Sequence, residues 1–296
     1  MQQKRRENAY TRLPVTPLER SDSSALSEPP STKRKSQLQN LSVTSASNGT
    51  AVVTIDRPER RNACNQAMWR GLAELFTRLR QDRTVHAVVL TGAGGHFCAG
   101  ADISEFADVR DDSAAALEYS RSVADAEQAI FHFPKPVIAA VSGYAMGGGC
   151  GLSLVCDFRV ADKSARFAIP AAKLGIVYSL DECRALATVV GVTHAKRILF
   201  TAEQVDAEEA ARIGLVDILA EQDALDAALE FAGRMSGNAP LSIEGAKVAL
   251  NAVATGEMAA RREEVALISR RAADSADYRE GRQAFLEKRK PRFTGS

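Results

Sequence analysis

The stretch GYAMGGGCG at residues 143–151 determines much of what can be inferred about this chain. It follows an apolar run at 136–141, which is typical of a buried strand, and leads into a helical pattern at 150–155. A second turn of small residues, HFCAGAD at 96–102, follows another apolar run at 86–91. Each turn therefore presents backbone N–H groups at the start of a probable helix, where they lack an acceptor within the helix. Because glycine and alanine let another atom approach closely, two such turns are able to hold one developing oxyanion between them.

Two other interpretations of these turns stay open at this point. Glycines that follow strands often serve only to turn the chain, and this applies to either segment taken alone. A binding site for nucleotide phosphates is less well supported. Neither segment contains the Gly-Lys-Ser/Thr sequence of a P-loop or a complete GxGxxG motif.

From Thr50 onward, short apolar runs alternate with helical patterns, which is typical of an α/β fold. After Pro170 the pattern is mostly helical, with one short apolar run at 215–219. We therefore expect a core at 50–235 and a helical C-terminal region at 236–296. The elements expected in the first part are strands at 51–55, 86–91 and 137–141 and helices at 66–79, 114–131 and 150–155.

The overall composition favours a soluble protein of a reducing compartment. The 38 basic and 37 acidic residues nearly cancel, so no global field attracts nucleic acid or an acidic membrane surface. No apolar stretch approaches the roughly 18 residues of a membrane span. The five cysteines form no Cys-x-x-Cys pair, which favours reduced thiols over a metal site or disulfides. We expect a cytoplasmic protein without a bound metal.

The first 49 residues have a different composition from the rest of the chain. They are rich in Ser, Arg, Lys, Thr and Pro and show almost no apolar periodicity, which predicts a disordered tail. Eight basic residues outnumber four acidic ones there, but the acids and the missing amphipathic stripe argue against a transit peptide. We expect deletion of residues 1–48 to leave assembly and turnover intact.

Four motifs in the same order resemble the crotonase, or enoyl-CoA hydratase/isomerase, superfamily. They are VTIDRPERRNACN at 53–65, FCAGAD at 97–102, GYAMGGGC at 143–150 and FLEKRKPRF at 285–293. The resemblance covers the chain from about Thr50 to its C-terminus. It implies a spiral of ββα repeats with a helical C-terminal trimerisation region, assembled as a homotrimer or hexamer. It also implies that the partner is an acyl-CoA thioester, in which coenzyme A is part of the substrate and no further cofactor is needed.

The resemblance implies roles for individual residues as well. The N–H groups of Ala101 and Gly148 would hold the thioester oxygen. Phe285 and Lys288 would approach the adenine of coenzyme A, commonly from a neighbouring subunit, although a basic run beside a chain end is often only a solvated surface. Further contacts to coenzyme A fall on Arg61, Ala63, Ala99, Asp102 and Ile103.

The general acid and base of the usual hydratase are absent from their expected places. In typical hydratases one glutamate lies three residues after the middle glycine and another directly follows a proline; here these places hold Gly151 and Ala171. The nearest titratable side chains expected in the acyl pocket are Tyr178, Asp181 and Glu182. We expect Asp181 or Glu182 to transfer protons, with Asp181 preferred. Capping of the helix that begins there is an equally plausible role for the two acids.

Three functions are compatible with this sequence. The first is a hydratase or isomerase of acyl-CoA thioesters with a relocated carboxylate, because an isomerase needs only one acid to move a proton between two carbons. The second is decarboxylation of a malonyl-type CoA or hydrolysis of a thioester, which needs the oxyanion site but no glutamate pair. The third is a non-catalytic subunit that binds acyl-CoA.

Overall fold

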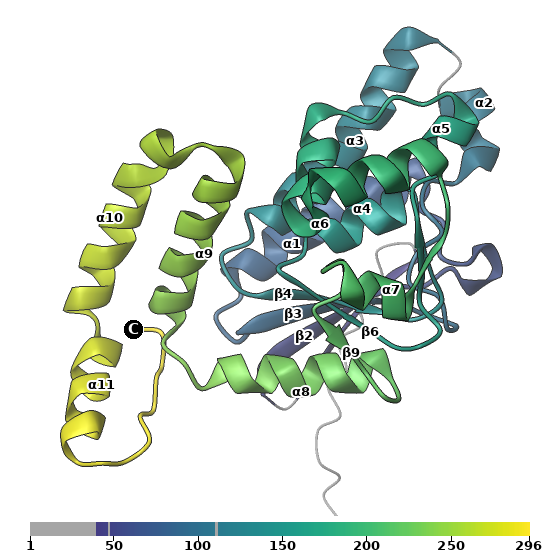
Figure 1. The fold of residues 1–296 in the computed structure, drawn as a ribbon. Helices are drawn as coiled ribbons and strands as arrows, with labels where there is room; N and C mark the ends of the chain where they lie inside the picture. Colours follow the sequence, from purple (N-terminus) through teal and green to yellow (C-terminus); the bar gives the residue numbers. More distant parts are fainter. Residues whose placement is uncertain (1–39, 47, 110–111) are drawn as a thin grey trace, which may run out of the picture. The chain divides into compact units, whose positions relative to one another are not determined.

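The computed structural model describes residues 40–46, 48–109 and 112–296, and the elements below all belong to the unit Lys35–Ser296. Within these residues six strands form the main sheet in the order β1-β2-β3-β4-β6-β9 (Figure 1). All its pairs are parallel except β1 with β2. The strands are β1 (Leu41–Ser45), β2 (Thr50–Ile55), β3 (Ala87–Gly92), β4 (Val137–Val141), β6 (Phe158–Ala161) and β9 (Ile218–Leu219).

A second sheet of three short strands has the order β5-β7-β8. β5 and β7 pair in parallel, and β7 and β8 pair in the antiparallel sense. These strands are β5 (Tyr144–Met146), β7 (Arg166–Ala168) and β8 (Val205–Asp206). β5 therefore lies inside the glycine-rich stretch, directly before its run of three glycines.

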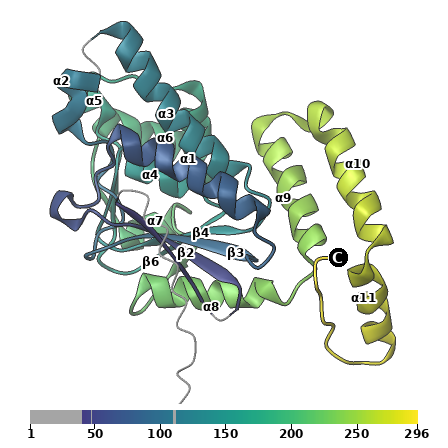
Figure 2. The ribbon, with the colours of Figure 1, turned by 180° about the vertical axis from the view of Figure 1, so that it is seen from behind.

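Helices cover both faces of the main sheet, as Figures 1 and 2 show from opposite sides. On one face, α8 places Ala224, Ala228 and Ala232 at a spacing of four residues, and these buried alanines pack against strands that include Val89 and Ile138. The larger helical layer on the other face includes α1 and α3, where Trp69 Nε1 donates to Tyr119 Oη at 3.0 Å. The helices of the core are η1 (Pro58–Arg60), α1 (Gln66–Gln81), η2 (Ile103–Glu105), α2 (Phe106–Val109), α3 (Ser113–Phe131), α4 (Gly148–Leu154), α5 (Ala171–Leu174), α6 (Leu180–Thr201), α7 (Ala207–Arg212) and α8 (Ala224–Ser236).

Three helices follow the core: α9 (Pro240–Thr255), α10 (Met258–Asp274) and α11 (Ala276–Leu286). A partly buried ion pair ties α9 to the core, with Lys247 Nζ 2.7 Å from Asp157 Oδ2. Asn251 Nδ2 adds a hydrogen bond to the carbonyl of Phe131 at the end of α3. The sequence expectation of an α/β fold with a helical C-terminal region is therefore confirmed. No helix among the described residues is long and apolar enough to cross a membrane.

The expected strands and helices are all present, with ends that shift by up to two residues. The predicted boundary of the N-terminal tail at residue 49 is wrong, because Leu41–Ser45 forms strand β1. Five residues of β1 pair with β2, and the Leu41 side chain is buried beside Gly71 of α1. Pairing with β2 and burial of Leu41 stabilise a strand that its own composition does not predict. The rest of the predicted tail, residues 1–39, lies outside the described residues.

Because of β1, the deletion that the sequence suggested as harmless removes part of the sheet. We predict that a chain beginning at Gly49 melts about 5 °C below one beginning at Asn40. Burial of a leucine side chain alone contributes about 2 kcal/mol, and the five strand pairs are lost with it. Thermal unfolding followed by circular dichroism measures the difference. Equal melting temperatures for the two chains would show that β1 contributes nothing to stability.

Candidate active site

The loop after β3 places Ala101 beside the segment that precedes α1. Cys64 forms a parallel bridge with Ala101, in which the Cys64 N–H donates to Gly100 O at 2.7 Å and the Asp102 N–H donates to Cys64 O at 2.9 Å. Ala101 lies between these two bonds, so its own N–H points to the opposite side of the extended segment. Among the loop and turn bonds of the described residues, no backbone carbonyl accepts from that N–H.

The glycine-rich stretch brings Gly148 to the same place. Gly147 has φ 51° and ψ −120°, a conformation essentially restricted to glycine, and its N–H donates to Ala168 O at 2.8 Å. Gly148 is then the first residue of α4, so its N–H has no acceptor within the helix. A Cβ on Gly148 would lie 3.2 Å from the ring of buried Trp69, so even a methyl group there would require the ring to shift by a few tenths of an ångström.

The two loops meet in direct backbone contact. Gly100 has φ 95°, and a Cβ on it would lie 3.3 Å from the Gly148 nitrogen. A Cβ on Gly148 would in turn lie 3.9 Å from the Ala101 nitrogen. The Ala101 and Gly148 nitrogens named from the sequence therefore lie close to each other. Two backbone donors placed side by side are able to bind a single oxygen atom when both point toward it.

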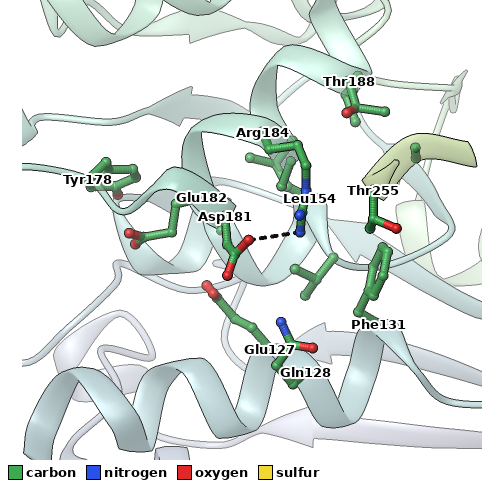
Figure 3. Close-up of a pocket in the computed structure, with 15 residues that line it drawn as sticks. Glu127, Gln128, Phe131, Leu154, Tyr178, Asp181, Glu182, Arg184, Thr188 and Thr255 are labelled. Atoms are coloured by element: carbon green, nitrogen blue, oxygen red, sulfur yellow. Dashed lines mark ion pairs between the residues drawn. The ribbon is translucent and has the colours of Figure 1, made fainter. Parts of the chain in front are cut away.

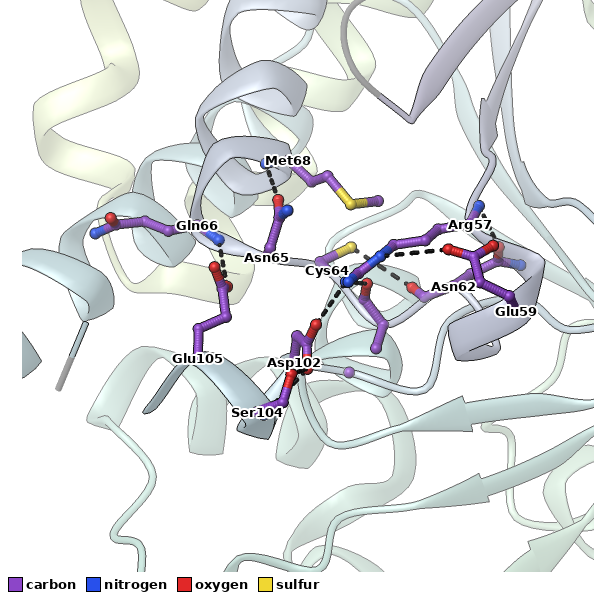
Figure 4. Close-up of polar contacts among 12 residues, drawn as sticks. Arg57, Glu59, Asn62, Cys64, Asn65, Gln66, Met68, Asp102, Ser104 and Glu105 are labelled. Atoms are coloured by element: carbon purple, nitrogen blue, oxygen red, sulfur yellow. Dashed lines mark hydrogen bonds and ion pairs between the residues drawn. The ribbon is translucent and has the colours of Figure 1, made fainter. Parts of the chain in front are cut away.

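An ion pair holds the Ala101 loop against the segment before α1 (Figure 4). Arg57 Nη1 lies 2.6 Å from Asp102 Oδ2 and also donates to the carbonyl of Ala63 at 3.1 Å. The other Asp102 oxygen accepts from the backbone N–H and the hydroxyl of Ser104. Burial opposes the charge on Asp102, but the hydrogen bonds from Ser104 and Arg57 outweigh it and lower the pKa of this carboxyl. The Asp102 side chain thus fixes the loop.

The structure brings together five of the seven residues expected to contact coenzyme A. The N–H of Ala99 donates to Arg61 O at 3.0 Å, and Ile103 follows Asp102 with more than half of its surface exposed. Phe285 and Lys288 do not join this group. They lie at the end of α11 and just after it, apart from α2 in both ribbon views, and Phe285 is 84% exposed (Figures 1 and 2). The five residues that come together are Arg61, Ala63, Ala99, Asp102 and Ile103.

A pocket next to α4 contains the three side chains expected in the acyl site (Figure 3). Tyr178, Asp181 and Glu182 enter it from α6 and the loop before α6. The Tyr178 hydroxyl lies 4.0 Å from the position of a Cβ on Gly147, which places it close to the glycine turn. Burial, followed by neighbouring acidic groups and thiols, raises the pKa of Tyr178 well above its ordinary value, so the phenol stays protonated. The other elements that line the pocket are α3, α4 and α9.

Both acids of α6 have local structural roles. Glu182 forms a capping box with Ser179: Glu182 Oε2 accepts from the Ser179 N–H at 2.7 Å, and the Ser179 hydroxyl accepts from the Glu182 N–H at 3.2 Å. Asp181 pairs with Arg184 at 3.1 Å, and its side chain is 64% exposed. The N-cap of α6 is therefore Ser179 and not Asp181, because the helix begins at Leu180, two residues earlier than that alternative requires. Of the two residues found in the sequence where the resemblance implies glutamates, Gly151 lines this pocket and Ala171 is buried at the start of α5.

One pocket residue was missed by the sequence reasoning. Glu127 of α3 lines the pocket, and its Oε1 is shielded from solvent without a hydrogen-bond partner. Burial raises the pKa of Glu127 to about 8, with smaller contributions from the charges of Glu182 and Asp181. The only signal in the sequence is its spacing: Glu127 shares a helix face with Val123 and Ile130, so an acid interrupts an apolar stripe.

The chain is similar to known proteins over most of its length. The sequence profile of the family described as Enoyl-CoA hydratase/isomerase matches residues 45–296. The chain is 36% identical over 250 residues to the 2,3-dehydroadipyl-CoA hydratase of Escherichia coli (strain K12), which covers 82% of this chain and 94% of that protein. It is also 36% identical over 258 residues to the (E)-benzylidenesuccinyl-CoA hydratase of Thauera aromatica, covering 84% of this chain and 97% of that protein.

Solved structures agree with the sequence comparison. An enoyl-CoA hydratase/carnithine racemase from Magnetospirillum magneticum has a TM-score of 0.79 and 36% identity, and the match covers 88% of this chain and 97% of that chain. The expected crotonase fold is thereby confirmed. The chain belongs to the enoyl-CoA hydratase/isomerase family.

Proposed function

We propose that this protein is an acyl-CoA-processing enzyme of hydratase/isomerase type, which holds the thioester oxygen between the N–H groups of Ala101 and Gly148. The observation that supports the proposal is the close approach of the two loops, which brings the Ala101 nitrogen near Gly148. When the carbonyl becomes an enolate, negative charge develops on its oxygen. Two donors about 2.7–3.1 Å from that oxygen stabilise the charge as it forms.

The neighbouring loops supply a route for coenzyme A. Arg61, Ala63, Ala99 and Ile103 lie around the Asp102 ion pair, on the side of Ala101 where the carrier would enter. A cationic side chain such as Arg61 is suited to the phosphates of coenzyme A. Phe285 and Lys288 of the same chain are apart from this group, so their expected contact with adenine requires a second subunit. This supports assembly as a homotrimer or hexamer, which size-exclusion chromatography with light scattering measures directly.

Hydration and isomerisation are favoured by the family and by the pocket. Both reactions move a proton at the carbon next to the thioester carbonyl, and acidic side chains line the pocket beside α4. A second candidate, decarboxylation of a malonyl-type CoA or thioester hydrolysis, is supported by one observation. Gly151 and Ala171 carry no acid at the usual two positions, and these reactions need no glutamate pair.

A substrate panel separates these functions. We expect turnover of a 2-enoyl-CoA to the hydrated product, or of a 3-enoyl-CoA to its 2-enoyl isomer, when each is followed by absorbance and mass spectrometry. Turnover only of a malonyl-type CoA, or release of free coenzyme A, would identify the second candidate. Acyl-CoA binding by calorimetry without turnover of any thioester would identify a non-catalytic binding subunit.

Replacement of one oxyanion donor tests the site itself. We predict that Gly148→Pro lowers kcat on the best substrate by roughly 10²–10³, because proline has no N–H at the first position of α4. Proline is tolerated at that helical position. Gly148→Ala is the matched control, since its Cβ meets the same Trp69 ring but its N–H is retained. Equal turnover by the proline and alanine variants would contradict the assignment.

A further inference from the structure

Glu127 is the acidic side chain of the pocket whose placement lacks a structural explanation. Its Oε1 is shielded from solvent and has no hydrogen-bond partner, although an unpaired buried carboxyl oxygen is unfavourable. Asp181 has Arg184 as an ion-pair partner, and Glu182 is held in the capping box with Ser179. Glu127 Oε1 therefore lacks a partner within the protein, whereas the two neighbouring acids already have partners.

Glu127 Oε1 lies beside Gly151 of α4, which has no side chain. A Cβ placed on Gly151 would lie 2.7 Å from Glu127 Oε1, so the end of the flexible Glu127 side chain would have to move to make room for it. The Glu127 carboxyl thus occupies the space that any side chain at residue 151 would enter. Gly148 and Gly151 are three residues apart and share a face of α4, so about one helical turn, roughly 5 Å, separates them. The carboxyl is accordingly placed near the carbon next to a carbonyl held at Gly148.

The groups around Glu127 are suited to a carboxyl that changes its protonation state. From α6, Asp181 and Glu182 face it with negative charge and Arg184 contributes the nearby positive charge (Figure 3). Tyr178 adds a neutral hydroxyl from the loop before α6, and α4 contributes only Gly151 and Leu154. No cation is paired with Glu127 among the described residues. Its neutral and ionised forms are therefore closer in free energy than those of an exposed glutamate.

We propose that Glu127 is the residue that exchanges a proton with the α-carbon of the bound acyl thioester, a role that rests on the proposed function. In this step the ionised carboxyl takes one proton from C2. The C–H electron pair forms the C1–C2 double bond, and the carbonyl pair moves to the oxygen held at Ala101 and Gly148. Return of the proton to C2 restores the thioester. Its delivery to C4 of a 3-enoyl thioester gives the 2-enoyl isomer, and Glu127 ends each cycle ionised.

Hydrogen exchange at C2 isolates this step from the rest of any reaction. The probe is butyryl-CoA in D₂O, with deuterium at C2 measured by NMR. We predict that Glu127→Gln lowers the exchange rate at least 100-fold, while calorimetry shows that butyryl-CoA still binds. Glu118→Gln is the matched control, because Glu118 lies on the same helix and its partner, Arg70, is exposed; this variant keeps the wild-type rate.

The outcomes distinguish this proposal from the proposed function. If wild-type protein neither binds butyryl-CoA nor exchanges C2, the proposed function itself fails. If wild-type protein exchanges C2 and Glu127→Gln does so at the same rate, only the role of Glu127 is overturned. Loss of exchange in Asp181→Asn, with exchange retained in Glu127→Gln, would assign the proton to Asp181 instead.

The dependence of exchange on pH supplies a second readout. Removal of the C2 proton requires ionised Glu127, whose pKa is raised to about 8. We predict that the wild-type rate rises about tenfold per pH unit below pH 8 and levels off above it. Asp181→Asn removes a negative neighbour, so the midpoint moves to lower pH. A profile that is flat between pH 6 and about 9 would contradict the assignment to this carboxyl.

A double variant that moves the carboxyl from α3 to α4 tests the proposal even if a single variant folds poorly. Glu127→Ala opens the space beside α4, and a second change, Gly151→Glu, then fills it from the opposite helix. We predict that this double variant exchanges C2 at least tenfold faster than the matched pair Glu127→Ala with Gly151→Gln. No difference between the two double variants would show that a carboxyl at this place does not carry the proton.

Discussion

The close approach of two backbone segments is the constraint on which the rest of this structure depends. The loop after β3 and the turn before α4 approach each other at Gly100, which has no room for a side chain, and at Gly148, where a Cβ would contact the Trp69 ring tightly. Such contact requires that the segments be held from elsewhere. The bridge between Cys64 and Ala101 holds the first loop, the bridge between Cys98 and Ala145 joins it to β5, and Arg57 clamps Asp102 at its end. Rigid strands on both sides thus position two N–H groups without any side chain at the site itself.

The absence of a side chain at Gly151 likewise leaves room for an acidic group in the pocket. Gly151 leaves a space beside α4, and Glu127 reaches into it from α3. A side chain at residue 151 would meet the Glu127 carboxyl, which would have to turn aside to make room. The space beside Gly151 therefore holds a carboxyl that belongs to α3 and not to α4.

Local patterns in the sequence predicted the parts of the structure that local interactions determine. The strands, the helices and the two small-residue turns follow from periodicity and glycine placement, and the structure brings Ala101 and Gly148 together as the motif order implied. β1 was assigned to the tail because its stabilisation comes from β2 and α1, which lie later in the chain. Glu127 was missed for a related reason. Its surroundings come from α4 and α6, and no sequence pattern within α3 indicates that Gly151 leaves space beside it.

Burial, together with the charges of the pocket, explains the raised pKa of Glu127. Three acids and one arginine line this space, and Arg184 pairs with Asp181. Glu182 accepts a hydrogen bond from the backbone N–H of Ser179, so this N–H and Arg184 are both already paired with the acids of α6. Glu127 is half-buried, its Oε1 is shielded from solvent, and no donor reaches that oxygen. Burial is the main reason that its pKa is raised, and the charges of Glu182 and Asp181 add to it. The neutral form of Glu127 fits the apolar wall of Leu154 and Phe131, so the packing of α3, α4 and α6 brings this carboxyl toward neutrality.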